Sequence, residues 1–325
     1  MIDITVLITA YNRKEYLIKA VDSVLNQSLN KNHYEIIVIK NFKDYKIDKY
    51  LIKNNIKNII MDGTEGEYIL KGMEEAQGKI ISFLDDDDLF TSEKLQYVYE
   101  IFNEHQDLIY LHNAYSEIDD NGNLLELNSN SIKVGNFNDF IINQNNNKSI
   151  IYGLKHLSDF NLSSISIAKS IKNTEYIRHI SHMTDTSLFY LALTNNGIVY
   201  ISSKRLTIVR FHMSTTRQNV EDDNAILSFL QNLNIEQNII FIRDYCKAYP
   251  FYSLLECKFY TNQIMQQIVK NQYRNVLKNV LRFFKCSFLI NFKVRFILLL
   301  VYIISYITKN NKLFIVLFKI NEKPK

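Results

Sequence analysis

The first 115 residues alternate short apolar runs with segments whose apolar positions recur at helical spacing. The runs are predicted to be buried strands and cover residues 4–8, 34–39, 59–61, 80–84 and 108–112. The segments between them predict helices near residues 17–25, 69–76 and 95–102. Gly78 stands where a glycine commonly ends a helix. This alternation predicts an α/β fold with a doubly wound parallel sheet.

The pattern changes beyond residue 115. Asp120-Asn121-Gly122-Asn123 predicts a hairpin turn, and strand-like patterns follow at 163–168, 198–201 and 206–211. Asp185 stands at the N-cap position of an apolar helix that Asn196-Gly197 ends. From about residue 222 the pattern is helical. We therefore predict a first domain over residues 1–218 and a helical C-terminal region over residues 219–325.

Composition excludes several classes of protein. The net charge of +4 and the pI of about 8.6 are too mild to indicate nucleic-acid binding. The first strand is followed neither by the glycine-rich loop of dinucleotide-binding proteins nor by a P-loop. Three cysteines without metal-binding spacing predict buried thiols in a reducing compartment. A cytoplasmic globular protein is the expectation.

Four consecutive carboxylates, Asp85 to Asp88, follow the apolar run at residues 80–84. Open α/β sheets bind ligands at the carboxyl ends of their strands. Four adjacent negative charges repel one another unless a cation is near, and oxygen ligands suit Mg²⁺ or Mn²⁺. The alternative is a solvated acidic turn before the helix that begins near Thr91.

Residues 3–215 resemble a family 2 glycosyltransferase with the GT-A fold. Four stretches carry the resemblance in the expected order, namely residues 6–13 with 23–27, residues 78–88, Thr184-Asp185 before an apolar helix, and residues 209–214. The resemblance implies a Rossmann-like mixed sheet flanked by helices, with a helical C-terminal extension. It also implies transfer of a sugar from a nucleoside-diphosphate sugar, with inversion and with metal assistance.

The resemblance assigns roles residue by residue. The donor would be bound by two sets of side chains, one in the nucleotide loop and one in the acidic run: Thr9, Ala10, Tyr11 and Arg13, then Asp85 and Asp86. Asp87 would bind the metal, while Asp88 would orient neighbouring groups. Arg210 would contact the diphosphate, and His212 the diphosphate or the metal. Tyr11 and Arg13 also fit ordinary surface positions, and His212 fits a structural histidine.

Two stretches depart from the family pattern. Lys40-Asn41 follows the second strand where the family usually has acidic residues, and lysine has no acceptor for a nucleotide base. Asn41 can accept through its amide oxygen, so it is the better candidate. Leu70-Lys71-Gly72 replaces an Arg-Asn pair, and Lys71 would supply the positive charge near the diphosphate unless it is a solvated helix lysine.

Asp185 is the candidate catalytic base, because an inverting transfer needs a carboxylate that takes the proton of the acceptor hydroxyl. The alternative is a plain helix N-cap. Asp159 and Asp139 are rival carboxylates in poorer sequence context. Two other functions remain open, a sugar nucleotidyltransferase and a catalytically degenerate sugar-nucleotide binder.

The C-terminal region ends in an apolar segment with basic flanks. Residues 296–307 carry no charge, and lysines and arginines lie on both sides. The segment is shorter than the ~20 residues of a membrane span. We predict peripheral attachment of residues 288–307 to the inner face of the cell membrane, with a glycan or lipid-linked acceptor. A core helix or a dimer interface is the alternative, which leaves the oligomeric state open.

Overall fold

The computed structural model describes residues 2–125, 135–211, 240, 242–269 and 276–286. The chain forms two compact units. The first contains Met1–Asn143 and Ser149–His212, and the second contains Gln144–Lys148 and Met213–Lys325. The predicted domain boundary at residue 218 lies outside the described residues.

The described strands are β1 (Ile4–Ala10), β2 (Tyr34–Lys40), β3 (Lys57–Ile60), β4 (Ile80–Asp85), β5 (Leu89–Phe90), β6 (Leu108–Ile118), β7 (Phe140–Ile141), β8 (Ile165–Ala168) and β9 (Ile198–Arg210). The described helices are α1 (Leu17–Leu25), α2 (Tyr45–Lys53), α3 (Glu65–Glu75), α4 (Lys94–Glu104), α5 (Asn147–Lys155), α6 (Thr184–Leu193), α9 (Tyr252–Val269) and α10 (Val276–Cys286). Short 3₁₀ helices are η1 (Lys31–His33), η3 (Leu162–Ser164) and η4 (Thr174–His179).

One mixed sheet runs through the first unit in the order β3-β2-β1-β4-β8-β6-β9-β5, and β7 pairs with β9. The pairs among β3, β2, β1 and β4 are parallel. Strand β8 lies between β4 and β6 and is antiparallel to both. The predicted α/β class is therefore confirmed. The five strands predicted within residues 1–115 run in one direction, because β4 and β6 are both antiparallel to β8, but β8 separates β6 from β4. The sheet is mixed, as the family resemblance implied.

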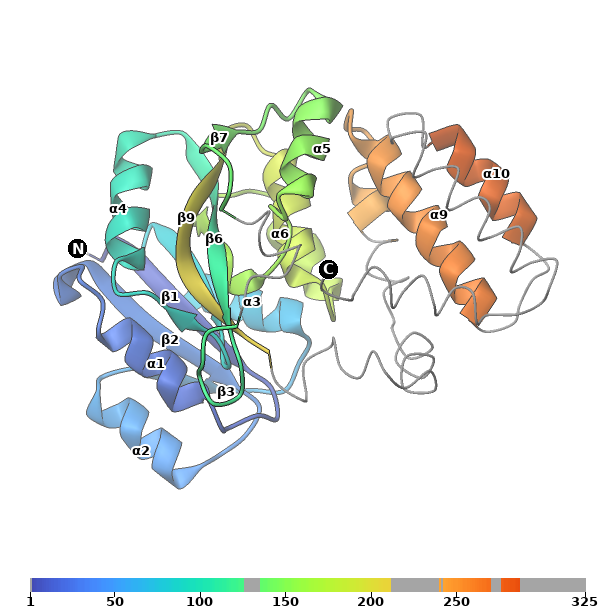
Figure 1. Cartoon of the computed structure of the whole chain (residues 1–325). Helices are drawn as coiled ribbons and strands as arrows, with labels where there is room; N and C mark the ends of the chain where they lie inside the picture. The colour runs from blue at the N-terminus through green and yellow to red at the C-terminus, as the bar shows by residue number, and fades with distance from the viewer. Residues whose placement is uncertain (1, 126–134, 212–239, 241, 270–275, 287–325) are drawn as a thin grey trace. The chain divides into compact units, whose positions relative to one another are not determined.

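Helices cover both faces of this sheet (Figure 1). Ile4, Val6 and Ile8 of β1 belong to one buried cluster with apolar residues of α1, α2 and α4. Leu7 points to the other face, where an added Cβ on Gly72 of α3 would lie 2.2 Å from it. Each fully buried aliphatic side chain contributes ~1.5–3 kcal/mol to folding. Because β1 is covered on both faces, its side chains are buried without alternation, Thr5 included.

Three details of the predicted elements change. Helix α2 was not predicted, although Asp44 caps it by accepting hydrogen bonds from the N–H groups of Lys46 and Ile47. Helix α3 ends at Glu75, so Gly78 does not end it. The Gly78 N–H donates to Thr5 Oγ1 at 3.0 Å instead. The two strands predicted over residues 198–211 form the single strand β9.

In the second unit, α9 and α10 pack against each other. Their buried side chains include Leu254, Leu255 and Ile264 of α9, and Val276, Val280 and Phe283 of α10. Helical structure was predicted here, and the described part of the unit is helical. None of the described helices is both long enough and apolar enough to cross a membrane. Residues 288–307 lie outside the described residues.

Candidate active site

The acidic cluster, Asp85 to Asp88, lies where β4 ends and the chain turns toward β5. Thr9 of β1 pairs with Asp85, so the loop after β1 begins beside the cluster. The N–H of Asp88 donates to the Asp85 carbonyl at 3.3 Å and closes the turn. Asp86, Asp87 and Asp88 are buried, whereas Asp85 is half-buried. The cluster therefore occupies the sheet edge at which open α/β folds bind ligands.

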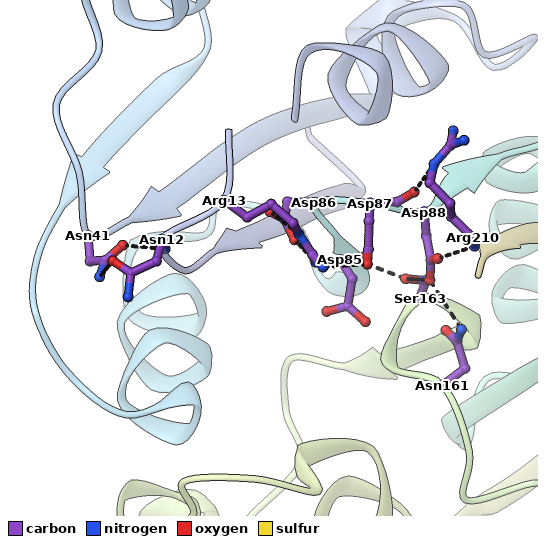
Figure 2. Close-up of polar contacts among 10 residues, drawn as sticks. All are labelled: Asn12, Arg13, Asn41, Asp85, Asp86, Asp87, Asp88, Asn161, Ser163 and Arg210. Atoms are coloured by element: carbon purple, nitrogen blue, oxygen red, sulfur yellow. Dashed lines mark hydrogen bonds and ion pairs between the residues drawn. The ribbon is translucent and has the colours of Figure 1, made fainter. Parts of the chain in front are cut away.

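Arg13 binds two of the four carboxylates (Figure 2). Its Nε and Nη2 both donate to Asp86, the former at 3.0 Å, and its Nη1 lies 2.8 Å from Asp87 Oδ2. Burial lowers the pKa of Arg13, but the hydrogen bond to Asp86 and the charge of Asp87 outweigh burial and raise it. Burial raises the pKa of Asp86 to about 6, against the lowering effect of Arg13. The guanidinium is thus the direct counter-charge of this cluster.

Asp88 joins the cluster to two other segments. Its Oδ2 accepts hydrogen bonds from Ser163 Oγ at 2.7 Å and Asn161 Nδ2 at 3.1 Å. Its Oδ1 accepts from the backbone N–H of Arg210 at 3.0 Å. Burial and then the charge of Asp87 raise the pKa of Asp88 to about 7. Both carboxylate oxygens of Asp88 are therefore used in hydrogen bonds within the protein.

Asp85 has a different environment from its three neighbours. Its backbone N–H donates to Ser163 Oγ at 2.9 Å, and its carboxylate stays partly exposed. Burial, followed by the charges of Asp88, Asp87 and Asp86, raises the pKa of Asp85 well above its usual value. A cation beside Asp85 would oppose this rise, because it stabilises the ionised carboxylate.

Arg210 reaches the acidic turn from β9, but through backbone carbonyl groups. Its Nε donates to the Asp87 carbonyl at 3.1 Å. Its Nη1 donates to the carbonyls of Asp119 at 3.0 Å and Asp120 at 3.3 Å. The guanidinium lies 4.6 Å from the centre of the Tyr16 ring. Arg210 is buried and clamps the acidic turn to the hairpin at residues 119–123; His212 lies outside the described residues.

The loop after β1 contains the predicted nucleotide-binding residues Thr9, Ala10 and Tyr11. Thr9 and Ala10 form the end of β1, with Ala10 buried. Tyr11 is 61% exposed, and its ring centre lies 6.5 Å from that of Tyr68. An exposed ring at the carboxyl edge of the sheet can stack on a nucleotide base.

Asn41 lies at the same loop and pairs with Asn12. The Asn12 N–H donates to Asn41 Oδ1 at 2.8 Å, and Asn41 Nδ2 donates to Asn12 Oδ1 at 2.8 Å. Asn12 has φ of 55°, a conformation that asparagine tolerates better than most residues. Lys40 is fully buried and lies 2.8 Å from Asp48, so it turns away from this loop. Asn41, not Lys40, therefore has its side chain at the loop after β1.

Lys71 lies on α3 and pairs with acidic residues of its own helix. Its Nζ lies 2.6 Å from Glu75 Oε1 and 3.8 Å from Glu74. The hydrogen bond to Glu75 raises the pKa of Lys71. Glu75 also pairs with Lys57 of β3. Lys71 therefore pairs with glutamates of its own helix and not with the acidic cluster. This is the environment expected for a solvated helix lysine, the alternative given by the sequence.

Asp185 is the second residue of α6, and Met183 is the N-cap. The predicted N-cap position of Asp185 is therefore wrong. Its Oδ1 accepts from the Thr186 N–H at 2.7 Å, and its Oδ2 accepts from the Asn161 N–H at 2.9 Å. The Asn161 side chain binds Asp88. A single residue thus connects the candidate base to the acidic cluster.

The rival carboxylates have other surroundings. Asp139 accepts hydrogen bonds from Tyr97, Tyr200, Ser202 and Ser203, which ties it to α4 and β9. Burial acts to raise the pKa of Asp139, but the hydrogen bonds from Ser203, Tyr200 and Tyr97 together outweigh burial, so the pKa is lowered. Asp159 meets α6 through its backbone carbonyl, which accepts from Thr186 Oγ1 at 3.3 Å.

The cluster contains ligand atoms of the kind that hard divalent cations prefer. Carboxylate oxygens suit Mg²⁺ or Mn²⁺, and the guanidinium of Arg13 pairs with two of the four carboxylates, Asp86 and Asp87. Within the described residues, no group of three or more His, Cys, Asp or Glu side chains is arranged to hold a metal ion. A cation at Asp85 and Asp87 would need further oxygens from a ligand or from water, as Mg²⁺ commonly has.

Sequence reasoning missed Asn161, Ser163 and Lys94. Lys94 is fully buried, and its Nζ donates to the Ser163 carbonyl and to Thr207 Oγ1, the latter at 3.0 Å. Burial lowers the pKa of Lys94 well below its usual value. Asn161 and Ser163 precede β8, which pairs with β4 only in the folded sheet. Only a prediction of that pairing would have placed them beside the acidic cluster.

Comparison with known proteins gives a family match. The model described as glycosyl transferase family 2 matches residues 5–160. An uncharacterized glycosyltransferase of Rickettsia bellii is 34% identical over 139 residues, which cover 41% of this chain and 19% of the relative. The minor teichoic acid biosynthesis protein GgaA of Bacillus subtilis is 32% identical over 137 residues, which cover 37% and 30% of the two chains. The chain thus spans less than a third of the length of these relatives.

Solved structures show the same fold. The crystal structure of S. aureus TarS has a TM-score of 0.60 and 15% identity, covering 97% of this chain and 54% of that chain. The structure of TarS 1-349 in complex with UDP-GlcNAc has a TM-score of 0.55 and 15% identity, covering 86% and 89% of the two chains. At this identity the likeness concerns the fold alone, and it confirms the predicted GT-A class.

Proposed function

We propose that this chain, whose residues 5–160 match glycosyl transferase family 2, transfers a sugar from a nucleoside-diphosphate sugar to a glycan or lipid-linked acceptor, with inversion at the anomeric carbon. The observation that carries this proposal is the link Asp185–Asn161–Asp88. Through this link, Asp185, which would serve the acceptor, and the acidic cluster, which would bind the donor, are held at the same edge of the sheet.

On the donor side, the proposal uses the loop after β1 and the acidic turn. Tyr11 stacks on the base, and Thr9, Ala10 and Asn41 line its pocket. Asp85 and Asp86 face the ribose and diphosphate, with Arg13 fixing Asp86 by hydrogen bonds. TarS is described in complex with UDP-GlcNAc, which makes uridine diphosphate sugars the first donors to test. Arg210 would add positive charge near the diphosphate, whereas Lys71 pairs with Glu74 and Glu75 of its own helix.

On the acceptor side, Asp185 acts as the general base. The acceptor oxygen attacks the anomeric carbon, the bond from that carbon to the diphosphate oxygen breaks, and the hydroxyl proton passes to the Asp185 carboxylate. The N–H groups of Asn161 and Thr186 hold this carboxylate in place. A general base must lie within hydrogen-bonding reach of the proton it removes, so this fixed orientation supports the assignment.

Asp87 is the proposed metal ligand, with His212, outside the described residues, as a second protein ligand. A bound Mg²⁺ or Mn²⁺ would neutralise the charge that develops on the diphosphate as it leaves. Arg13 contacts the same Asp87 carboxylate and orients it. Without these contacts the carboxylate would have to be ordered during binding, at an entropic cost.

We also propose that the enzyme works in the cytoplasm, at the inner face of the cell membrane, through residues 288–307. The supporting feature is an apolar, aromatic-rich segment between basic flanks. The domain division remains part of the same proposal, with a GT-A catalytic domain over residues 1–218 and a helical region over residues 219–325.

Slow hydrolysis of UDP-GlcNAc with Mn²⁺ tests the proposed activity. A transferase without acceptor leaks free sugar and UDP slowly, and chelation of Mn²⁺ should stop this release. A sugar nucleotidyltransferase would consume the donor only when pyrophosphate is added. A degenerate binder would hold the donor in calorimetry and release nothing. Either of the last two results would contradict the proposal, as would the absence of donor binding across a panel of nucleoside-diphosphate sugars.

A further inference from the structure

A groove lies in the first unit, at the end of the sheet opposite the acidic cluster. It has a volume of about 710 Å³ and includes Ile80, Leu108 and Ile198, the first residues of β4, β6 and β9. The acidic cluster follows the other end of β4. The groove is therefore separate from the candidate active site, and its volume falls within the ~300–1,000 Å³ typical of small-molecule sites.

One wall of this groove is formed by α4 and the turn after it. Tyr99, Phe102 and Asn103 line it from α4, and their spacing of three and four residues places them on one side of the helix. Gln106 lies two residues after the end of α4 and donates from Nε2 to the Asn103 carbonyl at 2.9 Å. The Tyr99 ring packs edge-on against His33, with ring centres 5.3 Å apart. Two aromatic rings and two amide side chains thus face the groove.

The floor and the rim differ in polarity. Ile80, Leu108 and Ile109 are buried apolar residues among the lining groups. The exposed lining residues are polar or charged and comprise Lys79, Asn103, Gln106, Asp107, Ser170 and Asn196. A ligand for this groove needs apolar faces for the rings and floor, and hydrogen-bonding groups at its edges.

The charges of the groove exclude anionic ligands. Lys79 is the one cationic side chain among the described lining residues, and Asp3 and Asp107 oppose it. Asp3 Oδ2 lies 2.7 Å from His33 Nδ1, which offsets part of its charge only when His33 is protonated. A phosphorylated or nucleic-acid ligand would meet net repulsion here. A purely apolar ligand would leave the amide and carboxylate groups without partners.

We propose that this groove binds a neutral oligosaccharide. Pyranose rings present apolar C–H faces that fit Tyr99 and Phe102, and hydroxyl edges that fit the amides of Asn103, Gln106 and Asn196. This binding does not depend on the proposed transfer. If the transfer occurs, the groove holds a remote part of a glycan acceptor and raises the local concentration of that acceptor.

Saturation-transfer NMR and calorimetry with chitotetraose and maltotetraose test the groove in the full-length protein. We expect at least one of these neutral oligosaccharides to bind with millimolar affinity. The double variant Asn103→Ala/Gln106→Ala should bind it at least tenfold more weakly, and both changes lie at exposed positions. Glu104→Ala is the matched control, because Glu104 is exposed on the same helix and is not part of the groove lining.

The outcomes separate this inference from the proposed transfer. If neither oligosaccharide binds, or if the double variant binds as tightly as the unmodified protein, the groove is not a saccharide site. Binding of inorganic phosphate in place of sugar would also overturn it. Hydrolysis of UDP-GlcNAc should be the same in the double variant. If the protein binds sugar through the groove but hydrolyses no donor, the proposed transfer is wrong and the groove is still a saccharide site.

Discussion

The four aspartates of the acidic turn differ in their contacts within the protein. Asp86 has a bidentate contact with Arg13, and Asp88 is bonded to Ser163, Asn161 and the Arg210 N–H. Asp85 remains partly exposed, with its pKa raised by burial and by the other three carboxylates. The arrangement is costly unless positive charge is added when the donor binds. In the proposed mechanism, Asp87 and Asp85 receive this charge.

Asp87→Asn tests the metal assignment. The change removes one negative charge while Arg13 keeps its contact with Asp86, so the melting temperature should stay the same or rise. Mn²⁺-dependent donor hydrolysis should fall by ~100-fold or more, because the charge on the leaving diphosphate loses its stabilisation. Calorimetry should also show weaker Mn²⁺ binding in the presence of UDP. Full activity of the variant in metal-free buffer would rule out this assignment.

Asp185→Asn separates a base from a structural carboxylate. The amide oxygen can still accept one of the two backbone hydrogen bonds, so the protein should fold. Donor affinity should hardly change, because the proposed mechanism places Asp185 on the acceptor side. Turnover should fall by ~10²-fold or more, the usual size of a general-base contribution. Asp159→Asn is the control and should keep most activity; collapse of donor affinity in Asp185→Asn would instead indicate a structural role or a donor ligand.

His112 of β6 gives the first unit a pH dependence of its own. The ring is buried and its Nε2 donates to the Phe160 carbonyl at 2.8 Å. Burial lowers the pKa of His112 from 6.5 to about 4. The unfolded chain therefore binds a proton that the folded protein does not bind between these values, so stability is lost as the pH falls through this range.

His112→Gln measures this contribution. The difference amounts to about 3 kcal/mol in the free energy of unfolding. Denaturant unfolding at pH 7.5 and pH 4.5 should show a smaller loss of stability in His112→Gln than in the unmodified protein. The carboxylates with raised pKa values act in the opposite direction in both proteins, so the comparison isolates the histidine. Equal losses in the two proteins would refute the assignment.

Sequence alone identified the residues of the acidic turn and the loop after β1, but not their partners. Asp85 to Asp88 and Arg13 stand out because they follow apolar strands directly. Ser163 and Asn161 have no such signal, because their role depends on β8 entering the sheet beside β4. Lys94 appears in sequence as an ordinary charged helix residue, yet it is fully buried. Local patterns therefore predict which residues lie at the site edge, while the contacts between them arise from tertiary structure.

At the scale of elements, α3 and η4 approach each other unusually closely. An added Cβ on Gly66 would lie 1.8 Å from the Ile177 carbonyl oxygen. The Gly66 N–H also donates to the Ile180 carbonyl at 3.0 Å. Segment η4 leads into α6, whose second residue is Asp185. The absence of a side chain at residue 66 thus allows the close approach that helps to position the candidate base.

Gly66→Ala tests this contact. Because the obstacle is backbone, it cannot rotate away, and the cost should be ~1–3 kcal/mol or more, the range for overpacked sites. Gly63→Ala is the matched control, since its nearest neighbour is the end of the flexible Glu67 side chain. Thermal unfolding should show a clear loss for Gly66→Ala and a smaller one for Gly63→Ala. Equal melting temperatures of the two variants would contradict the predicted backbone clash.

The order of strands explains which elements the sequence predicted. Consecutive strand–helix units β1, β2, β3 and β4 follow the local rules for parallel sheets and were predicted, although α2 between β2 and β3 was missed. The antiparallel strand β8 begins more than fifty residues after the start of β6. No local sequence pattern therefore indicates its place between β4 and β6. The single strand β9 was predicted as two because Ser202 to Arg205 interrupt its apolar pattern, at the bulges in its pairing with β6.

At the scale of the whole molecule, the second unit adds helices that the family match at residues 5–160 does not cover. Its described helices bury an apolar interface, while Leu277 and Leu281 of α10 are exposed beside Lys278 and Arg282. Beyond α10, residues 296–307 are uncharged and basic residues lie on both sides. Anionic lipid attracts such basic flanks, and apolar side chains then enter the interface.

Removal of the segment after Lys285 tests membrane attachment. We expect the full chain to sediment with liposomes that contain anionic phospholipid, and to bind less as salt increases because the charge term is screened. A version ending at Lys285 should stay in the supernatant while keeping donor hydrolysis, since the proposed active-site residues precede residue 213. Neutral phosphatidylcholine liposomes are the control and should bind the full chain weakly. If both versions remain in the supernatant with anionic liposomes, residues 288–307 pack within the protein or between its copies.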